Sequence, residues 1–201
     1  MTEQKKPVFN SLLTLRPDDK DSKLQLVFGA YNRSGSATFW KDGKRLGTIP
    51  LGKNMYGACG QIVALIRAAI KLDPGNQLAS TPVTNWDVKE GKATAEFTLV
   101  FGKDDKGIVY IGVTGNDIPK SKFPLRFPLK LDTSQVFDAK TSSIQAAESL
   151  VNFLEGQLQE AILKTEALPP PDRRGGGGGR SGGSGSSGGG SSSFTDDDMG
   201  F

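Results

Sequence analysis

Between residues 172 and 193 the chain has no hydrophobic side chain, and this stretch limits what the sequence can fold into. Residues 169–201 contain 12 of the 26 glycines. A segment of this composition has no apolar surface to bury, so it cannot join a packed core. We therefore predict one folded domain over residues 1–168, a disordered Gly/Ser/Arg linker over 169–193 and an acidic tip over 194–201.

The residue types that the chain lacks restrict its chemistry. There is no histidine among the 201 residues and there is one cysteine, Cys59. Histidine-dependent triads, histidine zinc sites and Cys-x-x-Cys pairs therefore cannot form. We predict no enzyme activity, no catalytic residue, no metal site and no cofactor, and we interpret Cys59 as a small packing residue.

The sequence also lacks signals for membrane insertion or secretion. It has no run of about 18 apolar residues, and residues 1–7 contain no apolar signal core. With one cysteine, no intrachain disulfide can form. These features indicate a cytoplasmic protein without a membrane partner.

Periodicity predicts a chain composed mainly of short strands. Alternating apolar residues indicate strands, and recurrence every three to four residues indicates helices. The predicted strands cover 11–16, 23–31, 36–41, 44–50, 94–101 and 108–114, and the predicted helices cover 55–72 and 141–167. Residues 76–92 are expected to be irregular.

Asp42-Gly43 is a strong signal for a two-residue hairpin turn, because type I′ turns need positive φ at both positions. This turn would pair Lys41 with Lys44. It would also pair Trp40 with Arg45 and Phe39 with Leu46.

Residues 120–131 alternate between apolar and mostly basic side chains. The odd positions from 123 onward are apolar, and the even positions are lysine, arginine or proline. Period two places all the bases on one face, and the prolines indicate an edge strand. The alternative interpretation is a solvated edge that is protected against aggregation.

The order of these elements predicts the fold class. Strands that are adjacent in sequence, with one helix between two hairpins, favour an antiparallel sheet that closes on itself. We predict a mainly β fold with flanking helices. The expected form is an OB-fold-like five-stranded antiparallel barrel with an inserted helix and a long C-terminal helix.

Strand parity also suggests a surface for single-stranded nucleic acid, which needs cations for phosphates and exposed rings for bases. Core packing remains the alternative for each ring, and parity does not assign a direction to Phe9 or Trp86. The predicted binding residues are Tyr31, Arg33, Trp40, Lys41, Lys44, Arg45, Tyr110, Lys120, Lys122, Arg126 and Lys130.

The tail ends in Phe194-Thr195-Asp196-Asp197-Asp198-Met199-Gly200-Phe201, which resembles the acidic tip of bacterial and bacteriophage single-stranded-DNA-binding proteins (SSBs). In that family an OB-fold is followed by a Gly-rich linker and a tip that typically reads D-F-D-D-D-I-P-F. Met199-Gly200 replaces Ile-Pro here. The alternative for the tail is an engineered linker or a solubility tail. The resemblance implies a phage-type SSB in the host cytoplasm, whose tip binds partner proteins through Asp196, Asp197, Asp198 and Phe201.

We therefore expect a protein that coats single-stranded DNA without sequence specificity during replication, recombination or repair. Its acidic tip would recruit replication and recombination proteins. The alternatives are an OB-fold RNA chaperone, a duplex-DNA binder and an interaction scaffold that binds no nucleic acid. The sequence does not indicate the oligomeric state.

Overall fold

The computed structural model divides the chain into two units, Met1–Leu168 and Pro169–Phe201. The predicted linker and tip lie outside the residues that it describes. The described residues are 9–19, 21–80, 82–87, 92–116, 118–127 and 137–165.

The first four strands form an antiparallel sheet, here called sheet A, in which each strand pairs with the next. They are β1 (Asn10–Leu15), β2 (Leu24–Tyr31), β3 (Ser34–Lys41) and β4 (Lys44–Gly52). Their inner face contributes Leu24, Leu26, Phe28, Ala37, Phe39 and Ile49 to the core.

The hairpin between β3 and β4 confirms most of the predicted pairing. Asp42 and Gly43 have φ angles of 50° and 75°, as a type I′ turn requires. The pairs Lys41–Lys44 and Trp40–Arg45 are present. The predicted pair of Phe39 with Leu46 is wrong, because an irregularity between Phe39 and Trp40 moves Phe39 opposite Gly47.

The remaining strands form a second antiparallel sheet, sheet B, in the order β5-β7-β8-β9, with β6 also paired to β7. The strands are β5 (Gln77–Ala79), β6 (Val83–Asp87), β7 (Lys92–Lys103), β8 (Val109–Gly115) and β9 (Ser121–Pro124). The prediction that residues 76–92 are irregular is wrong over Gln77–Ala79 and Val83–Asp87, which are strands. The long strand β7 pairs with both short strands, β5 near one end and β6 near the other.

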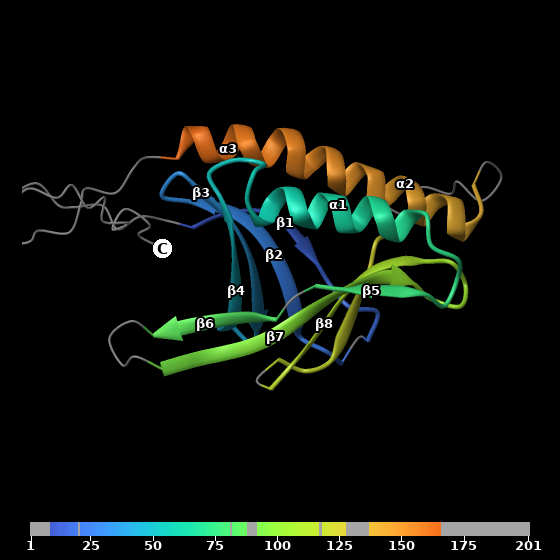
Figure 1. Ribbon diagram of the computed structural model, residues 1–201, viewed down its shortest axis with the longest axis horizontal. Coiled ribbons are helices and arrows are strands. Elements are labelled where there is room, and N and C mark those ends of the chain that lie inside the picture. The colour runs from blue at the N-terminus through green and yellow to red at the C-terminus, as the bar shows by residue number, and fades with distance from the viewer. Residues whose placement is uncertain are drawn as a thin grey trace, which may run out of the picture. The chain divides into compact units, whose positions relative to one another are not determined.

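Two helical segments pack against the sheets (Figure 1). Helix α1 (Ala58–Ile70) follows sheet A, and Asp73-Pro74-Gly75 follows its end as expected. The predicted long C-terminal helix is confirmed as α2 (Ala139–Asn152), a π-helical turn η1 (Phe153–Gln157) and α3 (Leu158–Lys164). Its apolar stripe is buried against the core, with Ala147, Val151, Leu154, Leu158 and Ile162 each at most 2% exposed.

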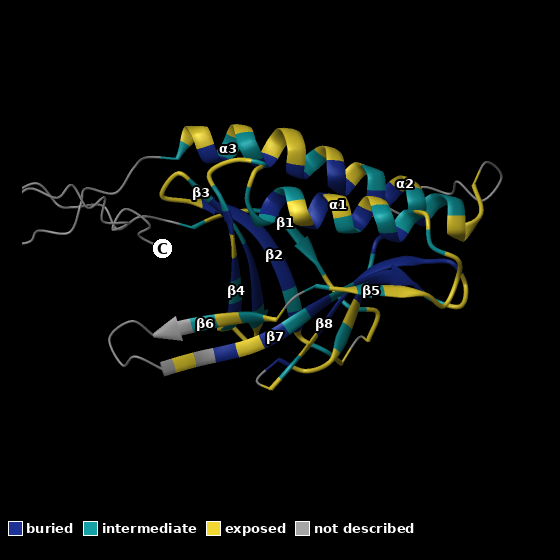
Figure 2. Ribbon diagram, in the orientation of Figure 1, coloured by how far each residue is buried: buried dark blue, intermediate teal, exposed yellow. Residues whose placement is uncertain are grey.

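A shared core joins the two sheets, as the buried inner faces in Figure 2 show. The ring of Phe39 in sheet A lies 5.4 Å from that of Phe97 and 6.0 Å from that of Phe123 in sheet B. The mainly β class is confirmed. The closed five-stranded barrel is not, because the strand pairs in the described ranges form two separate sheets.

The outer edge of β4 explains why the sheets do not join there. The Asn85 side chain in β6 accepts a hydrogen bond from the Thr48 amide and donates one to the Thr48 carbonyl, both at 2.7 Å. A side-chain amide therefore occupies the position that the next strand of a barrel would take.

Candidate nucleic-acid interface

The outer face of sheet A presents Trp40. In β2 the residues Leu24, Leu26 and Phe28 are at most 1% exposed, so the alternate residues of that strand face outward. Trp40 is the cross-strand partner of the outward residue Gln25 and is itself partly exposed. The outward direction predicted for this ring is therefore present in the structure.

Trp40 forms part of a shallow hollow of about 350 Å³ on this face. The ring of Phe9 lies over Gly29 on the same face, where a Cβ atom on residue 29 would collide with it. Strand alternation does not predict which way the Phe9 side chain points. The structure places this side chain in the hollow. The lining residues are Phe9, Ser11, Thr14, Lys23, Gln25, Val27, Trp40, Asp42 and Gly43.

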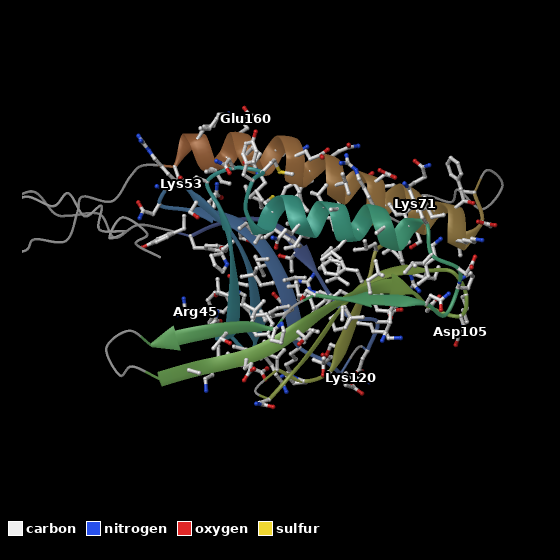
Figure 3. The ribbon with its side chains drawn as sticks, viewed as in Figure 1. Arg45, Lys53, Lys71, Asp105, Lys120 and Glu160 are labelled. Carbon is white, nitrogen blue, oxygen red and sulfur yellow. The ribbon has the colours of Figure 1, made fainter. Side chains whose placement is uncertain are left out.

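Exposed cations lie in the hairpin that carries Trp40, where Arg45 is the cross-strand partner of Trp40. Lys41, Lys44 and Arg45 are exposed in the β3–β4 hairpin, and Figure 3 labels Arg45. Lys23 on the rim of the hollow pairs with Asp42 at 3.0 Å. The hairpin thus keeps a surplus of positive charge next to Trp40, as single-strand binding requires.

Tyr31 and Arg33 lie at the other end of sheet A. Tyr31 pairs with Ser34, whereas Trp40 is six residues further along β3, about 20 Å at about 3.3 Å per residue. The backbone amide of Arg33 donates a hydrogen bond to the Thr165 hydroxyl at 2.7 Å, which holds this turn against the end of α3. The structure therefore does not bring these two residues together with Trp40.

Tyr110 faces outward from sheet B, but its ring is covered. Tyr110 is 4% exposed. Its hydroxyl donates to the Gln77 side-chain carbonyl at 2.8 Å, and the Lys122 ammonium lies 4.5 Å from the ring centroid. A base could stack on this ring only after Lys122 moved away.

The predicted basic stripe is present as far as residue 126. Phe123 and Leu125 are at most 2% exposed, whereas Lys120, Lys122 and Arg126 are exposed. Phe127 departs from the predicted alternation, because it is 48% exposed. Lys130 lies outside the described residues.

Acidic side chains lie among the bases of this stripe. Arg126 pairs with Asp18 at 3.1 Å. A second hollow, of about 320 Å³, is lined by Asp18, Asp19 and Asp104 as well as Lys120 and Lys122. This surface therefore favours phosphate less than the β3–β4 hairpin does.

Cys59 lies in the core, not in either hollow. It is fully buried, and burial raises the pKa of its thiol, so the reactive thiolate is disfavoured. The side-chain amide of Gln159 donates to its sulfur at 3.5 Å. These contacts agree with its interpretation as a packing residue.

The described ranges contain neither a cluster of metal ligands nor a membrane-spanning helix. Among those residues, no group of three or more acidic or cysteine side chains could hold a metal ion. No described helix has the length and apolar character to cross a lipid bilayer.

No protein-family model, curated protein or solved structure matches the chain. The interface described above therefore stands on its own geometry.

Sequence reasoning missed the polar side chains beside Trp40. Gln25 could have been found, because it alternates with Leu24 and Leu26 and so shares the outward face. Ser11 and Thr14 could not, because β1 is irregular between Ser11 and Leu13 and a strict alternation fails there.

Proposed function

We propose that the outer face of sheet A binds single-stranded DNA without strong sequence specificity. The observation that supports this most directly is the position of Trp40, a partly exposed ring in a hollow, with Arg45 as its cross-strand partner and Lys41 and Lys44 exposed in the same hairpin. Base stacking on a ring and phosphate contacts with neighbouring cations are the two components of such binding.

The shape of this face favours an unpaired strand over a duplex. In a duplex the faces of the bases are stacked on each other, so a ring on a sheet surface cannot reach them. An unpaired base can turn toward the protein and stack. The proposal does not depend on a closed OB-fold barrel, because an open sheet with rings and cations on one face offers the same contacts.

We further propose that the acidic segment 194–201 captures partner proteins in replication or recombination. This rests on its resemblance to the SSB tip and on its composition. Its aspartates suit a basic pocket, and Phe201 suits an adjoining apolar slot. A function as an RNA chaperone, a duplex-DNA binder or a scaffold without nucleic acid is the alternative outcome of the experiment below.

The test is a titration of the full chain with poly-dT, duplex DNA and RNA at several salt concentrations. The log of the binding constant for poly-dT should fall linearly with log salt, with a slope of about −0.7 per phosphate contacted. The double variant Lys41→Gln/Lys44→Gln should flatten the slope by about 1.4 if both side chains contact phosphates. If the chain binds none of the three ligands, the proposal is wrong, and the alternative that remains is a scaffold that binds no nucleic acid.

A further inference from the structure

The hollow on sheet A combines rings with uncharged polar groups. Its two charged residues, Lys23 and Asp42, lie at the rim and pair with each other at 3.0 Å, so they largely cancel. A phosphate would find no free charge inside it. Besides the rings of Phe9 and Trp40, the uncharged side chains that line it are Ser11, Thr14, Gln25 and Val27.

The positions on β2 next to the two rings are far enough apart for one planar group between them. Trp40 is the cross-strand partner of Gln25, and the Phe9 ring covers Gly29. Gln25 and Gly29 are four residues apart on β2, which is about 13 Å at about 3.3 Å per residue. Aromatic neighbours have centroids roughly 4.5–7 Å apart, so two successive contacts span roughly 9–14 Å.

We propose that this hollow binds one unpaired nucleobase between Phe9 and Trp40, and that the side-chain amide of Gln25 recognises the edge of that base. An amide presents a donor and an acceptor side by side, as the edges of nucleobases do. Gln25 lies directly across from Trp40, so the edge of a base stacked on Trp40 is within its reach. The inference rests on the proposed function and adds a preference among bases to it.

The first measurement separates base contacts from phosphate contacts. The full chain is titrated with labelled oligo-dT and with the same backbone in which every base is replaced by an abasic residue. Both strands have the same phosphates, so cation contacts are common to them. The abasic strand should bind about five- to 150-fold more weakly, the range expected for the loss of one stacked base.

The second measurement uses substitutions in the hollow. Phe9→Leu keeps an apolar side chain but removes the ring, so it should weaken oligo-dT binding several-fold and leave abasic binding nearly unchanged. Phe9→Tyr keeps the ring and should restore the affinity for oligo-dT. The matched control is Tyr56→Leu, because Tyr56 is 98% exposed and lies beyond the opposite end of β4; it should change neither affinity.

The role of Gln25 is tested by comparing oligo-dT, oligo-dC and oligo-dA. The wild-type chain should rank these strands, and Gln25→Ala should bring their affinities together. If Gln25→Ala leaves the ranking of the three strands unchanged, the Gln25 side-chain amide does not recognise the base.

The outcomes distinguish this inference from the proposed function. If the abasic strand binds as tightly as oligo-dT, the hollow takes no base, while single-strand binding through phosphates still stands. If no strand binds even at low salt, both proposals are wrong.

Discussion

At the scale of single residues, Trp40 is the side chain whose two possible roles are easiest to separate. It lies on the outer face of sheet A, whereas Phe39 and Ala37 of the same strand point into the core. A ring on the outside can be removed without leaving an enclosed cavity. Its loss should therefore change binding more than stability.

Trp40→Ala should cost about 1–3 kcal/mol of affinity for single-stranded DNA, because one stacking contact is lost. Its effect on the free energy of unfolding should stay well below the roughly 3–5 kcal/mol that a buried tryptophan costs. Fluorescence anisotropy and thermal unfolding measure the two effects. Tyr31→Ala is the control, since Tyr31 is an exposed ring at the far end of the sheet; a large loss of stability in Trp40→Ala would contradict the binding role.

Asp138 gives a prediction about pH. Its carboxylate accepts a hydrogen bond from the Thr141 amide at 2.6 Å and caps α2. That hydrogen bond lowers the pKa of Asp138 below its ordinary value of 3.8. Because the folded-state pKa is lowered, the stabilising contribution is present above pH 3.8 and is lost as the pH falls through the folded-state value.

Asp138→Ala should therefore lower the melting temperature at pH 7, and its difference from wild type should shrink as the pH falls below about 4. Asp138→Asn is the matched variant, because asparagine also caps helices but does not titrate. It should stay close to wild type at pH 7. A difference between Asp138→Ala and wild type that is the same at pH 3 and pH 7 would show that capping by the charged form is not the cause.

At the scale of elements, the parity of strands was predictable and the exposure of their outer side chains was not. Alternation placed Trp40 and Tyr110 outward because it depends only on the strand that contains them. The burial of Tyr110 depends on Gln77 and Lys122, which come from β5 and β9. No local pattern in β8 contains that information.

The number and pairing of strands were only partly predictable for the same reason. Asp42-Gly43 fixes a turn locally, so the β3–β4 hairpin was found. The short strands β5 and β6 have too few residues to show an alternation of apolar and polar side chains. They are strands because their backbones pair with the edge of β7. The π-helical turn η1 was also missed; the Leu154 carbonyl within it accepts a hydrogen bond from the Gln159 side chain at 3.1 Å.

The edge strand β9 gives a prediction that tests whether sheet B belongs to the interface. If Lys122 and Arg126 contact phosphates, Lys122→Gln/Arg126→Gln should flatten the salt dependence of poly-dT binding by about 1.4. Titrations of the wild-type chain and of this variant with poly-dT at several salt concentrations measure the change in slope. Lys53→Gln/Lys71→Gln is the control, because these exposed lysines flank α1, as Figure 3 shows. An unchanged slope in the β9 variant would restrict the interface to sheet A.

At the scale of the whole molecule, the acidic segment 194–201 and the basic hairpin of sheet A belong to one chain. The linker predicted over residues 169–193, if flexible, would give this segment an effective concentration of about millimolar order near the body. Three aspartates at that concentration should compete weakly with nucleic acid for the cations. Salt screens this competition, so it should be strongest at low ionic strength.

Deleting residues 194–201 should therefore raise the affinity for nucleic acid modestly, and more at low salt than at high salt. The same deletion should abolish capture of replication proteins in a pull-down. Affinity titrations at two salt concentrations and the pull-down measure the two effects. If the deletion changes neither, the tail is a solubility segment.

Two substitutions in this segment should separate the effects. Phe201→Ala removes no charge, so it should impair partner capture and leave the competition with nucleic acid nearly unchanged. Replacing Asp196, Asp197 and Asp198 by asparagine should relieve the competition and also impair capture. If both variants change the nucleic-acid affinity equally, the competition between the acidic segment and nucleic acid is not electrostatic.

The contact between Asn85 and Thr48 has a consequence for how copies of this protein can associate. A free strand edge is a template onto which another chain can add a strand, and folded proteins need to block it. The Asn85 amide uses both the donor and the acceptor of Thr48 that β4 would offer to such a chain. A chain that adds a strand along β4 therefore has to displace the Asn85 amide from Thr48.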